Sequence, residues 1–160
     1  MSRPSPPPNP SATEVTKATQ RSVMLVFGRR RRPLFALSVS LLFGAMAGWG
    51  EEWLFRGVFQ TALGEVLSGN AAIAVSGLVF GLLHAITPVY ALLAAAASVY
   101  FGYLYNATHN LAVSMICHAA YDVVALMWAH WTVTGMSPGE QEEIWASGPG
   151  APRKETATRD

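Results

Sequence analysis

The chain has 160 residues, of which 51% are hydrophobic and only 13% are charged. Soluble domains carry about a quarter charged residues, so this composition argues against an ordinary soluble domain. The net charge of +1 divides into +6 over residues 1–32, −3 over residues 33–139 and −2 over residues 140–160. This division is typical of a membrane protein with a basic cytoplasmic flank. The basic residues are few and lack interleaved aromatic residues, so no nucleic-acid partner is indicated.

The N-terminal part of the chain is polar and basic. Residues 1–20 are rich in Pro, Ser and Thr, and they offer little apolar surface to offset the entropy lost on ordering. Residues 21–28 can form a short interfacial segment, and residues 29–32 are all arginine. Arginines next to an apolar segment favour the cytoplasmic side of a membrane. We therefore interpret residues 1–32 as a disordered, basic cytoplasmic tail.

Hydrophobic segments dominate the middle of the chain. We predict four membrane spans, over residues 33–48, 71–86, 89–105 and 111–131. A kink is expected at Gly48, Trp49 and Gly50. A cleaved signal peptide ending near Ala45 is an alternative for the first segment, but the tail before it is long and the chain after it is equally apolar. The sequence thus predicts an all-α integral membrane bundle of about four transmembrane helices, with residues 33–131 as its core.

The last part of the chain, residues 132–160, is polar and rich in Pro, Gly and charged residues. We predict a mostly disordered C-terminal tail. Because four spans return the chain to the side where it began, both termini are expected in the cytoplasm. The predicted partner of the core is the lipid bilayer.

Three formal charges interrupt the first apolar stretch at Glu51, Glu52 and Arg56. A charge at the centre of a bilayer costs about 2.5–3.5 kcal/mol on insertion scales, so such residues are normally paired and functional. Glu52 and Arg56 are four residues apart and can pair on one helix face. Glu51 then points about 100° away and remains as a free carboxylate, suited to a general base. The alternative is an ion cluster that only fixes helix packing.

Two further spans contribute ionisable residues. Phe80 and His84 share a face of the second span, and His118 and Asp122 share a face of the fourth. A histidine that only binds a backbone carbonyl and a purely structural His–Asp pair are the alternatives. In a bundle, each of these side chains avoids lipid by pointing inward, towards the others. Carboxylates and imidazoles around one polar cavity can activate water and stabilise an oxyanion.

Three short motifs carry a specific resemblance. Residues 51–56 (EEWLFR) resemble the EExxxR motif of the CAAX protease and bacteriocin-processing family, residues 80–84 (FGLLH) its FxxxH motif, and residues 118–122 (HAAYD) its HxxxN/D motif. The resemblance covers about residues 44–126. It implies an intramembrane endopeptidase of a bacterial inner membrane that cleaves a membrane-associated protein or a peptide precursor. CAAX-type processing, bacteriocin-type processing and self-immunity are the roles that it suggests.

The resemblance also implies roles for single residues. Glu51 would be the catalytic base and act with His84 on a water molecule, while His118 and Asp122 would stabilise the oxyanion. Glu52 and Arg56 would support the site. The sequence departs from the eukaryotic prenyl-protein endopeptidases at Asp122, where they have Asn. Because an ionised Asp cannot donate a hydrogen bond, Asp122 is expected to be protonated, to orient His118, or to bind a cation.

Alternatives for the cofactor and for the function remain open at this point. Glu51, His84 and His118 offer a zinc ligand set with an open position, as in a metalloprotease, but the chain has no HExxH motif. The site can also be described without a metal. A non-catalytic membrane immunity or scaffolding protein with the same fold is the second functional hypothesis. A haem bundle with His84 and His118 as ligands is the third, and it leaves the EExxxR motif unexplained.

Overall fold

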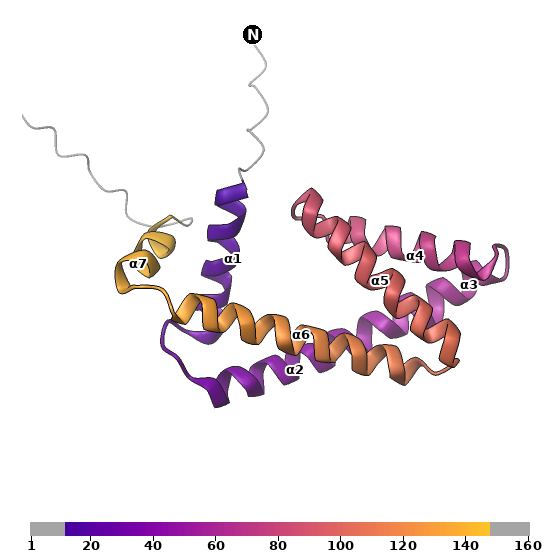
Figure 1. Ribbon diagram of the computed structural model, residues 1–160, viewed down its shortest axis with the longest axis horizontal. Coiled ribbons are helices and arrows are strands. Elements are labelled where there is room, and N and C mark those ends of the chain that lie inside the picture. Colours follow the sequence, from indigo (N-terminus) through magenta and orange to yellow (C-terminus); the bar gives the residue numbers. More distant parts are fainter. Residues whose placement is uncertain (1–11, 148–160) are drawn as a thin grey trace, which may run out of the picture. The chain divides into compact units, whose positions relative to one another are not determined.

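The structure, a computed structural model, describes residues 12–147. The predictions for residues 1–11 and 148–160 lie outside the described residues. Within the described part all regular elements are helical (Figure 1): α1 (Ala12–Phe27), α2 (Pro33–Glu52), the π-helix η1 (Trp53–Gln60), α3 (Thr61–Gly64), α4 (Gly69–Leu83), α5 (Pro88–Thr108), α6 (Leu111–Thr134) and α7 (Pro138–Ala146). The predicted all-α fold is confirmed.

Within residues 12–147, three continuous helical stretches are long and apolar enough to cross a membrane. They are Pro33–Gly64, which joins α2, η1 and α3, then Pro88–Thr108 and Leu111–Thr134. Helix α4 is apolar but has only 15 residues, fewer than the roughly 20 that a perpendicular span needs. The structure therefore supports an integral membrane protein, with α4 as a shorter fourth helix of the predicted bundle.

The chain forms two compact units. One comprises residues 32–128 and contains α2 to α5 with most of α6, and the other comprises, among the described residues, 12–31 and 129–147. In the larger unit, Pro33 and Pro88 occupy the first turns of α2 and α5, where a missing N–H costs nothing. The Thr87 hydroxyl accepts a hydrogen bond from Tyr90 N at 3.1 Å and caps α5. Helix α5 thus begins at the predicted break between the spans over residues 71–86 and 89–105.

The helix is not interrupted at residues 48–50, where the sequence suggested a kink. Helix α2 runs through these residues to Glu52, and the irregular turn is the π-helix that follows. Polar side chains bind carbonyls of this wide turn: Thr61 Oγ1 donates to Arg56 O at 2.8 Å and Ser76 Oγ to Phe55 O at 3.4 Å. Single π turns are frequent at functional sites.

Glycines serve helix packing in the larger unit. A Cβ atom built on Gly48 would lie 2.6 Å from the carbonyl oxygen of Met115 in α6, and one on Gly81 would lie 2.6 Å from that of Ala91 in α5. Helices α2 and α6 therefore touch through their backbones, as do α4 and α5 (Figure 1). Small residues allow this close approach in membranes. The glycine at position 48 is thus explained by close helix packing.

We expect Gly48→Ala to destabilise the protein by about 1–3 kcal/mol, the usual cost of overpacking. The rigid Met115 carbonyl cannot move away as the end of a flexible side chain could. Gly50→Ala, in the same helix, is the control, because nothing lies within 4 Å of its added Cβ and alanine favours a helix by up to about 1 kcal/mol. The measurement is the thermal unfolding midpoint in detergent, and equal midpoints for the two variants would refute the packing argument.

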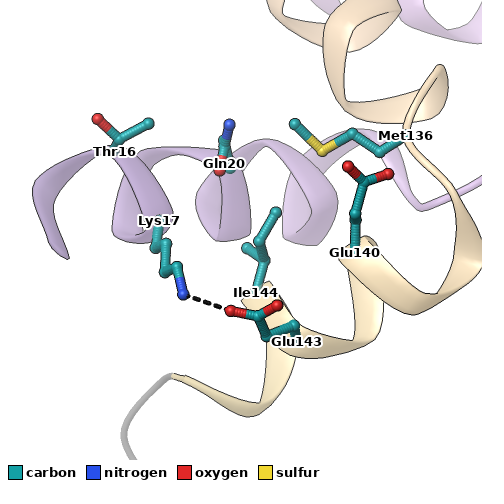
Figure 2. A pocket seen from close by; sticks show the side chains of 7 residues that line it. All are labelled: Thr16, Lys17, Gln20, Met136, Glu140, Glu143 and Ile144. Atoms are coloured by element: carbon teal, nitrogen blue, oxygen red, sulfur yellow. Dashed lines mark hydrogen bonds and ion pairs between the residues drawn. The ribbon is translucent and has the colours of Figure 1, made fainter. Parts of the chain in front are cut away.

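In the smaller unit, parts of both predicted tails are helical and not disordered. Residues 12–27 and 138–146 form helices α1 and α7, and Met24, Val133 and Ile144 make a small buried core. Lys17 Nζ and Glu143 Oε1 form an ion pair at 2.7 Å, which Figure 2 shows beside a groove of about 440 Å³ between the two helices. Each tail lacks enough apolar surface alone, but the two together bury a shared core.

Local capping adds to the order of α7. Ser137 Oγ accepts a hydrogen bond from Glu140 N at 3.3 Å, and the Glu140 carboxylate accepts one from Ser137 N at 2.8 Å. This reciprocal arrangement is a capping box. Hydrogen bonds from the Ser137 hydroxyl and backbone lower the pKa of the exposed Glu140 carboxyl. Carboxylate formation at Glu140 therefore favours the start of α7.

Candidate active site

The larger unit brings together the ionisable residues that the sequence singled out. Glu51 and Glu52 lie in the last turn of α2, and Arg56 lies in the π-helix. His84 follows the last residue of α4 as its C-cap. His118 and Asp122 lie one turn apart in α6. The site thus forms where three separate stretches of the chain meet.

A buried ion pair forms the base of the site. Arg56 Nη1 lies 3.0 Å from Glu52 Oε1, and both side chains have no exposed area. The pair that the sequence predicted is confirmed. The same Glu52 oxygen also accepts a hydrogen bond from His118 Nδ1 at 2.8 Å. This contact, which the sequence does not predict, joins the buried ion pair directly to a candidate catalytic ring.

Ser98 of α5 completes the buried part, and sequence reasoning missed it. Arg56 Nη2 donates to Ser98 Oγ at 2.7 Å and also to the Ser98 carbonyl. One turn further along both helices, Gln60 Nε2 donates to Gly102 O at 3.2 Å. One feature of the sequence could have indicated Ser98. It follows an alanine run and lies four residues before Gly102, the same spacing that separates Arg56 from Gln60. These contacts fix the rotation of α5 against the π-helix.

Glu51 faces the open part of the site, and 37% of its side chain is exposed. Its Oε2 lies 3.8 Å from His84 Nε2 and 3.9 Å from His118 Nε2. Asp122 Oδ2 lies 3.7 Å from the same His118 nitrogen. These separations are too long for direct hydrogen bonds, but a bridging water can span them. The open groups are therefore spaced to hold small polar molecules between them.

Both imidazole rings are held in fixed orientations. His84 Nδ1 lies 2.8 Å from Phe80 O, and its ring stacks on Phe80 with centroids 4.1 Å apart. The His118 ring stacks on Phe101 with centroids 4.9 Å apart. Because a carbonyl oxygen only accepts, His84 carries its hydrogen on Nδ1 and, when neutral, presents Nε2 as an acceptor. The carbonyl contact therefore orients His84 towards Glu51 and does not remove it from the site.

A cavity of about 210 Å³ connects these groups. Helix α5 forms one of its walls, which the sequence analysis did not anticipate. The lining residues are Glu51, Phe80, His84, Tyr90, Leu93, Ala94, Ala97, Phe101, His118, Tyr121 and Asp122. Helices α5 and α6 form the exposed rim of the cavity. About half of the surface area of Tyr90, Leu93 and Tyr121 on this rim is exposed. The reactive groups thus lie in a small half-open pocket.

The predicted zinc ligand set does not fit this geometry. Zinc needs three or four ligand atoms about 2.0–2.2 Å from a common point. Among residues 12–147, no group of three His, Cys, Asp or Glu side chains is arranged to hold a metal ion. Glu51, His84 and His118 thus line one cavity without forming a zinc ligand set.

The fold and the site define an integral membrane protein with an acid–base cluster enclosed by its helices. The model of the family described as Type II CAAX prenyl endopeptidase Rce1-like matches residues 33–124, more than half of the chain. The chain therefore belongs to this family of CAAX-type intramembrane proteases, which confirms the resemblance seen in its three motifs. The matched range contains all six ionisable site residues. Comparison with curated proteins gave no match, and comparison with solved structures gave none either.

Proposed function

We propose that this protein is an intramembrane endopeptidase in which Glu51 and His84 activate water to hydrolyse a peptide bond. The substrate would be a membrane-associated protein or a peptide precursor. One observation carries the proposal: Glu51 Oε2 lies within 4 Å of the Nε2 atoms of both His84 and His118, beside a cavity. Family membership supports the same class of reaction.

The accepting atoms of Glu51 and His84 orient the bridging water molecule. The Glu51 carboxylate only accepts, and neutral His84 presents an accepting Nε2, so a bridging water donates one hydrogen to each. Its oxygen lone pairs then point away from both and towards a bound carbonyl carbon. The water oxygen bonds to that carbon as Glu51 takes one proton. Breakage of the C–N bond follows, and the proton passes from Glu51 to the leaving nitrogen.

His118 is suited to stabilise the oxyanion only in its doubly protonated form. Its Nδ1 binds the Glu52 carboxylate, so a neutral ring would have no hydrogen on Nε2. The imidazolium form, whose charge Glu52 balances, donates from Nε2 to the developing oxyanion. Asp122 Oδ2 lies 3.7 Å from this nitrogen, beyond a direct hydrogen bond, so the proposed role of its carboxylate is to stabilise the imidazolium charge of His118.

The proposal includes a location and an orientation. Three apolar helical stretches support an integral membrane protein, and arginines at residues 29–32 favour a cytoplasmic N-terminus. Both termini would then lie in the cytoplasm of a bacterial cell, whose inner membrane holds the substrate. CAAX-type and bacteriocin-type precursors are the substrate classes to compare first.

The test is a profile of peptide termini in membranes from cells that carry the wild-type protein or the Glu51→Ala variant. We expect termini that appear only with the wild-type protein. Identical termini in both would overturn the proposal. A non-catalytic immunity or scaffolding protein would keep its phenotype in the Glu51→Ala variant, so scoring the phenotype alongside separates the two hypotheses.

We also expect the hydrolysis to survive removal of divalent metal ions. The site lacks a ligand set, and the proposed water activation uses only Glu51 and His84. The measurement is the cleavage rate in liposomes before and after dialysis against EDTA. The expected rate is unchanged within twofold. A loss that zinc restores would contradict this mechanism and return Glu51 and the histidines to a metal site.

A further inference from the structure

Three consecutive arginines of the smaller unit, Arg29, Arg30 and Arg31, have different surroundings. Arg29 is half-buried, and its Nη1 lies 2.7 Å from Glu142 Oε2 in α7. Arg30 and Arg31 are exposed. In the part of the chain that the structure describes, neither of them has a carboxylate at ion-pair distance. Helix α7 thus balances the first of these charges, while no described carboxylate balances the other two.

A tryptophan holds one of these two charges in place. The guanidinium carbon of Arg31 lies 4.6 Å from the centre of the Trp131 ring, which is a cation–π contact. The ring has no oxygen atom to accept hydrogen bonds from the five N–H groups of the guanidinium. Both side chains are exposed. Arg31 therefore has a fixed place and donors that can bind an anion from outside.

The chain places this contact at a membrane surface. Arg31 precedes Pro33, where the first apolar stretch begins, and Trp131 lies in the last turn of the stretch that ends at Thr134. Tryptophan is typical of the boundary between lipid and water. The phosphate groups of phospholipids lie at this same boundary, and anionic phospholipids attract basic residues beside a span. Arginine matches phosphate oxygens with pairs of parallel N–H donors.

The last turn of α1 favours a lipid over a soluble anion. Met24 and Phe27 of this turn are buried, whereas Leu25 and Val26 are exposed. Exposed aliphatic side chains close in sequence to basic residues are typical of segments that lie in the membrane interface. Acyl chains can cover Leu25 and Val26, which a free phosphate ion cannot do. The apolar and the basic residues together fit a phospholipid.

We propose that Arg30 and Arg31, with Arg31 held on Trp131, bind the phosphate group of an anionic phospholipid at the membrane surface. Arg29 does not belong to this site, because Glu142 already engages its guanidinium. The site lies in the smaller unit, and neither its ligand nor its test depends on the proposed hydrolysis. Its effect is to attach the smaller unit to membranes that contain anionic lipid.

The test is native mass spectrometry of the full-length protein in detergent, with equal amounts of phosphatidylglycerol and phosphatidylcholine that carry the same acyl chains. An arginine near an anionic surface raises affinity about fivefold, and two raise it about 25-fold. The wild-type protein should prefer phosphatidylglycerol by about that factor. Arg30→Gln should lower the preference about fivefold, and Arg30→Gln combined with Arg31→Gln should leave less than a twofold preference. Arg29→Gln is the matched control and should change the preference by less than twofold.

Three outcomes would overturn the proposal. The first is equal retention of the two lipids by the wild-type protein. The second is an equal loss of preference in the Arg29→Gln and Arg30→Gln proteins, because general attraction by a basic segment would then explain the binding. The third is displacement of phosphatidylglycerol by inorganic phosphate, which would assign the site to a free anion. If the double variant does not fold, Arg30→Gln alone decides, since Arg30 is exposed and its replacement disturbs no packing.

Discussion

Replacing Glu51 by glutamine should reduce kcat/KM for peptide hydrolysis by about 10²–10⁴-fold, the usual contribution of a general base. The amide keeps the shape of the carboxylate but cannot take a proton from water. Because Glu51 is partly exposed and its nearest imidazole nitrogens are 3.8 and 3.9 Å away, no close hydrogen bond of the fold is lost. The measurement is the turnover, in liposomes, of a peptide identified from the profile of termini.

Two controls make this result specific to the reaction. Glu65→Gln changes an exposed glutamate that does not line the cavity, and it should retain wild-type turnover. The unfolding midpoint of the Glu51→Gln protein should match that of the wild type within a few degrees. Turnover above a tenth of the wild-type rate in a folded Glu51→Gln protein would show that another group takes the proton.

The residues that belong to the site could be predicted from the sequence, because lipid tolerates few charged side chains. Glu51, His84 and His118 lie in three apolar stretches, and each avoids lipid only by pointing into the bundle. The structure places these three around one cavity. The sequence pattern alone shows the helix face that each of these residues occupies. It predicts which residues meet, but not which atoms pair.

Pairing between helices could not be predicted in the same way. The spacing of four residues suggested His118 and Asp122 as partners, yet His118 Nδ1 binds Glu52 at 2.8 Å while Asp122 stays 3.7 Å from Nε2. The contact of Arg56 with Ser98 likewise joins two different helices. Both depend on how far α5 and α6 are rotated against α2 and η1, and no local spacing encodes that rotation.

The structure near the two ends of the chain could not be predicted from local sequence either. Residues 1–20 and 132–160 each have the composition of a disordered tail, but α1 and α7 contact each other across more than a hundred residues of sequence. Arg29 and Glu142 form an ion pair at 2.7 Å, and Arg29 also lies over the Trp145 ring at 4.7 Å. Composition within a window cannot show that two distant segments complete each other's core.

Loss of the buried guanidinium should have the largest effect on stability. We expect Arg56→Met to lower the free energy of unfolding by about 3–5 kcal/mol, because the buried Glu52 carboxylate loses its permanently charged partner and keeps only its contact with His118. Ser98 also loses its contact with Arg56. Arg30→Met is the matched control, since Arg30 is exposed and substitutions at exposed sites usually change stability by less than about 0.5 kcal/mol. The measurement is the unfolding midpoint in detergent of each full-length variant.

A double variant distinguishes the cost of burying an unpaired charge from the cost of lost packing. If the destabilisation arises from the uncompensated carboxylate, Glu52→Gln combined with Arg56→Met should be more stable than Arg56→Met alone, because the double variant buries neither charge. If lost packing dominates, the double variant should be no more stable than the single one. That second result would mean that Arg56 acts mainly by filling space beside Ser98 and not by neutralising Glu52. The orientation of His118 would then depend on its own contact with Glu52, without support from the arginine.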